Sequence, residues 1–152
     1  MEGPRVPLAR LFVMGAGQLI AQLHERLADE GWSDTRPSFG FVLARLREEP
    51  ATITSLAAFL GITKQAGSKL IEQMQEAGLV EVGPHPSDAR ARLVTITPEG
   101  ERLRDAAERI YADLEAVWAR EIGADAVEAM RRDLGAILRA TNDGELPPIR
   151  PI

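Results

Sequence analysis

Two lysines lie five residues apart in one short segment, and they are the only lysines in the chain. Lys64 and Lys69 both fall in Gly61–Leu70, and no acidic residue occurs between Pro50 and Ile71, although the whole chain has a net charge of −5. A segment without acidic residues in an otherwise acidic protein does not repel an anionic partner. For a helix of this design the expected partner is double-stranded DNA.

The polar side chains around these lysines have the chemistry needed to read a DNA groove. Glutamine can pair bidentately with adenine, lysine can bond guanine or phosphate, and serine can donate or accept a hydrogen bond. Gly67 is expected to let the helix backbone approach a groove wall. The alternative is an ordinary solvated helix face. The candidate DNA-contacting residues of this segment are Thr63, Lys64, Gln65, Ser68 and Lys69.

A second group of charged residues follows about twenty positions later, in Asp88-Ala89-Arg90-Ala91-Arg92. An arginine at the tip of a β-hairpin suits the narrow minor groove, whose negative potential attracts a guanidinium group. We predict that Arg90 and Arg92 contact DNA and that Asp88 braces an arginine in an extended pose. The alternative is an ordinary Asp–Arg turn pair, worth roughly 0–1 kcal/mol.

Helical periodicity and capping residues predict the elements that position these side chains. Apolar residues from Leu8 to Leu27 recur at three- and four-residue steps, and that helix should end near Gly31. A second helix follows Pro37 and stops at Pro50. A short helix capped by Thr52 or Thr54 and ended by Gly61 precedes one capped by Thr63 and ended by Gly78. Ala66, Leu70, Met74 and Ala77 should form the buried face of the latter, and the pair makes a helix-turn-helix.

After Gly78 the apolar residues alternate at every second position, which predicts a two-stranded hairpin, or wing, over residues 79–97. Thr97-Pro98-Glu99 is a strong helix start, and that helix should run to Gly123. A last amphipathic helix covers 127–138, and the tail from Gly144 should be irregular. The fold class is therefore mainly α with a small β wing. The terminal helices have more apolar surface than one small core can cover, so two copies could cover it for each other.

Composition bounds the remaining possibilities. A chain of 152 residues fits one domain, and it has no cysteine for disulfides, thiolate metal sites or thiol chemistry. His24 and His85 lack partners at nucleophile or metal-ligand spacing, so we expect neither an enzyme nor a cofactor. The apolar stretch before Leu23 is too short and too polar to span a bilayer. We expect a cytoplasmic protein that does not bind membranes.

The few aromatic residues suggest a ligand pocket as well as a core. Several come from the first, second and fifth predicted helices and could line a cavity for an apolar ligand. Packing in the core is the alternative role for most of them. The candidate pocket residues are Phe12, His24, Trp32, Phe41 and Tyr111.

The chain resembles the MarR family of transcription regulators over nearly its whole length. Residues 54–65, Thr54-Ser55-Leu56-Ala57 through Thr63-Lys64-Gln65, look like the family's helix-turn-helix. Gly78-Leu79-Val80 looks like its helix-to-strand step. The most specific match is Asp88-Ala89-Arg90-Ala91-Arg92 followed by Leu93 to Gly100, which fixes Asp-x-Arg and Thr-x-x-Gly at set spacing.

The resemblance implies a homodimeric repressor or activator that binds a pseudo-palindromic operator and is modulated by a small, often aromatic, anionic effector. It assigns 34–100 to a DNA-binding lobe, 5–31 and 98–141 to dimerisation helices, and 142–152 to a tail, within a single domain 1–152. Val82-Gly83 stands where the family often has a basic residue, so the wing is less positive. The rival hypothesis is a winged helix that contacts protein or RNA and has no operator.

Overall fold

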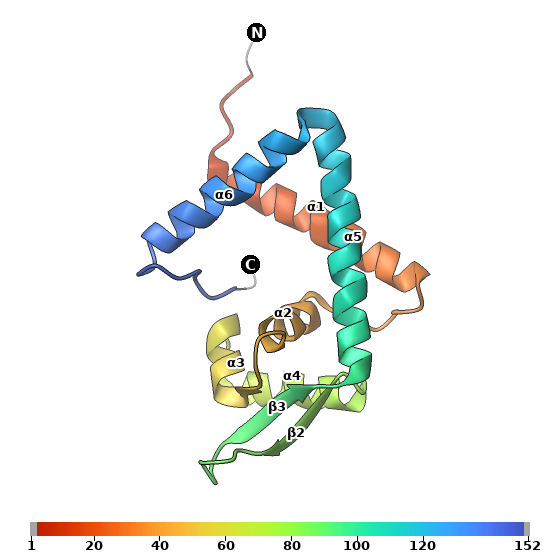
Figure 1. The fold of residues 1–152 in the computed structure, drawn as a ribbon, viewed down its shortest axis with the longest axis vertical. Coiled ribbons are helices and arrows are strands. Elements are labelled where there is room, and N and C mark those ends of the chain that lie inside the picture. The colour runs from red at the N-terminus through yellow and green to blue at the C-terminus, as the bar shows by residue number, and fades with distance from the viewer. Residues whose placement is uncertain (1–2, 151–152) are drawn as a thin grey trace.

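The computed structural model describes residues 3–150, and within that range it contains six helices and three short strands (Figure 1). Helices α1 and α6 lie at one end of the molecule, α2, α3, α4 and the strands lie at the other, and α5 runs between the two ends. The elements in chain order are α1 (Leu8–Asp29), α2 (Pro37–Leu46), β1 (Ala51–Thr52), α3 (Ile53–Leu60), α4 (Lys64–Glu76), β2 (Val80–Pro84), β3 (Arg92–Ile96), α5 (Pro98–Ile122) and α6 (Ala124–Ala140).

Three helices begin at a threonine whose hydroxyl oxygen accepts a backbone N–H three residues on. Each bond is 3.1 Å long and satisfies one of the donors that a helix start leaves free. Of the two alternatives for α3, the cap is Thr52 rather than Thr54. The pairs are Thr52 with Ser55, Thr63 with Ala66, and Thr97 with Gly100.

The sheet has a third strand that the sequence pattern did not predict. Its order is β1-β3-β2, and β1 pairs antiparallel to β3 through Ala51 opposite Val94 and Thr52 opposite Leu93. Two residues are too few for an alternating pattern to be visible in the sequence. The hairpin of β2 and β3 is the predicted wing, with Val82 opposite Val94.

The buried face of α4 is rotated relative to the prediction. Leu70 and Met74 are buried as expected, but Ala66 and Ala77 are exposed, and Ile71 is buried in their place. Gly67 is buried too, because α3 approaches α4 closely at this point. A β-carbon on Gly67 would lie only 2.8 Å from Cβ of Ala57. The prediction that Gly67 faces a DNA groove is therefore wrong, since this glycine permits helix–helix contact.

The start of α5 is bonded to the junction between α4 and β2. The hydroxyl of Thr97 donates to the carbonyl of Gly78 at 2.6 Å, and its N–H donates to the carbonyl of Leu79 at 3.1 Å. Any β-carbon at Gly100 would meet that same Leu79 carbonyl and the side chain of Ile96. The Thr-x-x-Gly spacing therefore joins the wing, the helix-turn-helix and the long helix α5 at one point.

One apolar core lies between the sheet and the helices that pack against it. It includes no buried polar or charged residue among those that the structure describes. The most deeply buried side chains come from α1, α2, α3, α4, the strands and α5, so the core joins both ends of the molecule. They are Leu27, Val42, Leu43, Leu56, Leu60, Ile71, Met74, Val80, Val94 and Ile110.

Candidate nucleic-acid interface

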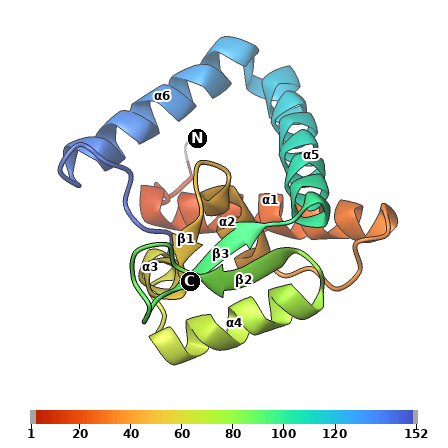
Figure 2. The ribbon, with the colours of Figure 1, turned by 60° about the horizontal axis from the view of Figure 1, so that its bottom comes forward.

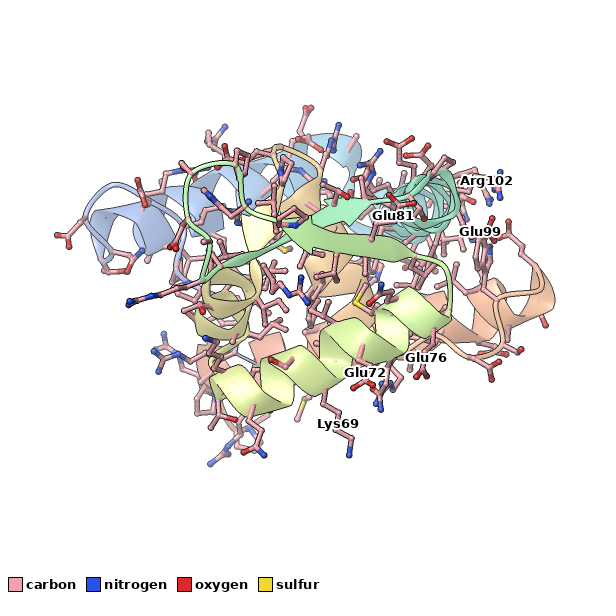
Figure 3. The ribbon with its side chains drawn as sticks, turned by 90° about the horizontal axis from the view of Figure 1, so that it is seen from below. Lys69, Glu72, Glu76, Glu81, Glu99 and Arg102 are labelled. Carbon is pink, nitrogen blue, oxygen red and sulfur yellow. The ribbon has the colours of Figure 1, made fainter. Side chains whose placement is uncertain are left out.

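The N-terminal half of α4 presents the predicted polar residues to solvent. Lys64, Gln65, Ser68 and Lys69 are all exposed, and Thr63 holds the start of the helix through its cap. Figure 3, which views the molecule from the α4 side, shows Lys69 projecting away from the body. Side chains at a helix N-terminus are the ones that reach base edges when a helix of this kind docks in a major groove.

Acidic residues begin one turn further along the same helix. Glu72 and Glu76 lie toward the C-terminal half of α4 in Figure 3, and Glu81 follows on β2. Glu72 also borders a shallow hollow beside Gln65 and Lys69. The acid-free surface therefore ends at Glu72, and only the first half of α4 can approach a polyanion without repulsion.

Asp88 braces the wing through the backbone rather than through a guanidinium group. Its Oδ1 atom accepts the N–H of Arg90 at 3.0 Å, and its carbonyl accepts the N–H of Ala91 at 3.1 Å. Both bonds close a tight turn of the kind that aspartate favours. The side chain of Arg90 consequently remains available for another anion.

A hollow of about 260 Å³ brings the wing and the helix-turn-helix together. Lys64 and Ser68 of α4 face it from one side and Arg90 of the wing from another, so residues more than twenty positions apart share one surface. The start of α3 completes the hollow. Its lining residues are Thr52, Ile53, Thr54, Lys64, Ser68, Asp88, Arg90, Ala91 and Arg92.

Thr54 is the residue of this surface that the sequence reasoning missed as a candidate contact. The sequence pattern indicates only a helix cap at this position, yet Thr54 lines the hollow together with Lys64. The signal that could have identified it is the acid-free segment, which starts at Pro50 and so includes it.

The cations of this surface have no ion-pair partner among residues 3–150. Eight arginines elsewhere in that range form ion pairs with carboxylates, for example Arg26 with Asp113 at 2.9 Å. Lys64, Lys69 and Arg90 form none there, and neither does Arg92. Their charges are free to attract an external anion such as a phosphate.

A separate, mostly apolar cavity of about 160 Å³ lies between α1, α2 and α5. Three of the five predicted pocket residues line it, namely His24, Phe41 and Tyr111. Phe12 and Trp32 do not. Phe12 is exposed on the first half of α1, and Trp32 packs against the core beyond that helix. Two of the five predicted pocket residues therefore lie outside the cavity, because helix spacing alone does not show which aromatic residues come together in space.

Polar groups at the wall of this cavity are few and specific. Nδ1 of His24 lies 3.2 Å from Oγ1 of Thr35, and burial lowers the pKa of His24 below its ordinary value of 6.5. Burial likewise raises the pKa of Tyr111. The Nε atom of Arg104 is buried and has no hydrogen-bond partner among the described residues. The Arg36 guanidinium stacks 4.9 Å above the Phe39 ring and donates to Gln73 of α4.

Metal-ligand clusters and membrane-spanning helices do not occur among residues 3–150. No group of three or more histidine or carboxylate side chains is placed to hold a metal ion. Every helix in that range is too short or too polar to cross a membrane.

Comparisons with known proteins point to one family. A model of the MarR family matches residues 35–91. The regulator PetP of Rhodobacter capsulatus is 32% identical over 93 residues, which cover 60% of this chain and 55% of that protein. The chain thus spans about half the length of this curated relative.

Solved structures extend the similarity beyond the matched segment. The reduced form of MarR from E. coli has a TM-score of 0.76 and 25% identity, covering 90% of this chain and 99% of the other. A mutant of the same protein complexed with operator DNA has a TM-score of 0.70 and 25% identity, covering 88% and 94%. MepR from S. aureus, at 19% identity and a TM-score of 0.73, shows a shared fold.

Proposed function

Because this chain belongs to the MarR family of transcription regulators, we propose that it is a sequence-specific DNA-binding repressor that acts as a homodimer. The observation that carries this proposal is the hollow between α4 and the wing, where unpaired cations from two distant segments meet. Among the residues that the structure describes, Asp88 is the only acid that lines it, and Asp88 is engaged with the backbone of Arg90.

The proposed docking follows from the shape of this surface. The first half of α4 enters a major groove, where Gln65 and Ser68 read base edges and Lys64 and Lys69 bond phosphate or guanine. The wing extends to the adjacent minor groove and inserts Arg90. Most of these contacts are electrostatic, so affinity falls steeply as salt concentration rises.

Exposed apolar side chains on the terminal helices support a homodimer. They lie on the first half of α1, the end of α5 and on α6, which matches the proposed dimerisation helices over 5–31 and 98–141. A monomer rarely exposes so many large apolar groups on neighbouring elements. A two-fold arrangement would set the two recognition helices about 34–36 Å apart, one turn of DNA.

The cavity between α1, α2 and α5 is the proposed site of a small effector. Its walls are mainly apolar, and its charged lining residues are Arg36, Arg104 and Glu108, of which Glu108 is paired with Arg47. A flat apolar molecule with an anionic group would match that lining. Arg36 also bonds Gln73 of the recognition helix, so an occupant of the cavity that draws Arg36 away would disturb α4.

Gel-shift titration with the DNA just upstream of the protein's own coding sequence tests the proposal. We expect a discrete complex that survives an excess of unrelated duplex DNA. Equal affinity for unrelated DNA would overturn sequence-specific regulation. Absence of binding to any duplex would favour the rival function, a winged helix that contacts protein or RNA.

A further inference from the structure

The C-terminal tail returns from α6 to the helix-turn-helix. Figures 1 and 2 show it leaving the end of α6 and running to α3. There the side chain of Arg150 lies across Gly61, the residue that ends α3. A β-carbon on Gly61 would be 2.9 Å from Cγ, 3.3 Å from Cδ and 3.4 Å from Nε of Arg150. The stem of the arginine is therefore in direct contact with the turn of the helix-turn-helix.

Burial along the tail indicates that it is docked rather than free. Pro147 and Ile149 are partly buried, whereas Leu146, Pro148 and Arg150 are exposed. This alternation is typical of an extended segment with one side against the protein. The tail thereby carries a cation from the far end of the chain to the DNA-binding lobe.

Electrostatics explain why an arginine is tolerated at this turn. The C-terminal end of a helix has a partial negative charge, and α3 has no basic residue of its own in its last turn. No acid occurs between Pro50 and Ile71 to pair with the guanidinium group. Arg150 also forms no ion pair within residues 3–150, so its charge remains available.

The contacted turn leads directly into the proposed recognition helix. Gly61 precedes the cap Thr63 by two residues, so their Cα atoms are at most about 7 Å apart. Lys64 follows immediately on the exposed face of α4. We propose that Arg150 is a further phosphate contact of the DNA interface, delivered to it by the C-terminal tail. This inference rests on the proposed DNA-binding function.

A phosphate is the expected target because the guanidinium group comes to the turn from outside the recognition helix. Side chains on α4 itself are placed to reach base edges, while a flanking arginine meets the backbone on either side of the groove. Contact with one phosphate contributes about 0.9 to the slope of log affinity against log salt on duplex DNA.

The test compares Arg150→Ala and Arg150→Lys with the wild-type protein on a duplex of unrelated sequence. Affinity is measured from 50 to 200 mM salt. We expect Arg150→Ala to reduce the slope by about 0.9 and Arg150→Lys to retain most of it, because phosphate contact requires a charge but no particular base. Thermal unfolding of each variant is measured in parallel.

Arg102→Ala is the matched control, since it removes the same charge from an exposed arginine of α5 that pairs with Glu99. An unchanged slope in Arg150→Ala, or a loss equal to that of Arg102→Ala, would overturn the inference. A lower melting temperature with an unchanged slope would reduce Arg150 to a stabiliser of the end of α3. Wild-type binding in either case keeps the proposed function intact, whereas a wild type that binds neither this duplex nor the DNA upstream of its own coding sequence refutes both.

Discussion

At the scale of single residues, the two lysines of α4 have the simplest expected behaviour. Both are exposed, and neither has an ion-pair partner among the described residues. We expect Lys64→Ala and Lys69→Ala each to weaken binding to all sequences alike and to reduce the salt slope by about 1. Fluorescence anisotropy over a salt series measures this. Slopes that stay at the wild-type value in both variants would mean that these lysines are solvated or bond bases.

Asp88 allows a test of how the wing turn is held, because its side chain accepts a backbone N–H rather than bonding a guanidinium group. An asparagine retains the accepting oxygen, so Asp88→Asn should preserve affinity for a duplex with A·T-rich flanks. Asp88→Ala removes the acceptor and should weaken binding in the same direction as Arg90→Ala, but less. Titration of the three variants with this duplex shows whether Asp88 acts through its hydrogen bond to the backbone or through its negative charge. If Asp88→Asn lost as much affinity as Asp88→Ala, the negative charge itself would be required.

His24 should make stability depend on pH. Its pKa is lowered in the folded protein by burial, so below pH 6.5 the unfolded chain binds more protons than the native one. The free energy of unfolding should therefore fall as pH drops through the interval between 6.5 and the folded pKa. Urea unfolding at pH 7.5 and pH 5.5 should show a larger loss for wild type than for His24→Gln. Identical losses would show that protonation of His24 does not oppose folding.

At the scale of elements, the contact between α3 and α4 depends on the absence of a side chain at one position. Gly67→Ala would force its new methyl group against Cβ of Ala57. Such overpacking costs about 1–3 kcal/mol, partly offset by about 1 kcal/mol of better helix propensity. We expect a lower free energy of unfolding in urea.

Ala57→Gly in the same chain supplies the control for that prediction. It removes the atom that the new methyl group would strike, so the double variant should lose less stability than the sum of the two single losses. A Gly67→Ala protein as stable as wild type would mean that the two helices separate without cost.

At the scale of the whole molecule, the exposed apolar side chains determine the expected assembly. Leu8 and Met14 of α1 and Ile137 of α6 are each more than 60% exposed in the single chain. We expect light scattering to report a dimer at micromolar concentration. Ile137→Glu should shift the population toward monomer, because a charge would have to be buried at the interface. Circular dichroism should remain near wild type, while DNA affinity falls with the loss of paired recognition helices.

A monomeric wild-type protein would contradict both the dimer and its operator spacing. Ser38→Ala, at a partly buried position of α2 in the other half of the molecule, serves as the control substitution for this experiment. It should leave the assembly unchanged.

Interactions between neighbouring residues determine much of this protein's secondary structure, and these could be identified from the sequence alone. Threonine caps, prolines at helix starts and glycines with positive φ act through neighbouring residues, so the helix-turn-helix and the wing hairpin could be predicted from residues such as Thr63 and Gly61. The charged candidates on α4 could be identified too, because an acid-free segment is visible in one dimension. These features depend on short-range interactions that the chain order itself displays.

Only the tertiary structure decided which distant groups meet. In the folded chain β1 pairs with β3, and Gly67 packs against Ala57. Asp88 accepts a backbone N–H, and Arg150 contacts Gly61. The tertiary structure also selected His24, Phe41 and Tyr111 for one cavity and left Phe12 exposed. The physical reason is that packing sets the rotation of each helix and the path of each loop. Periodicity predicts that a helix has a buried face, but the neighbouring elements determine which residues of that face touch.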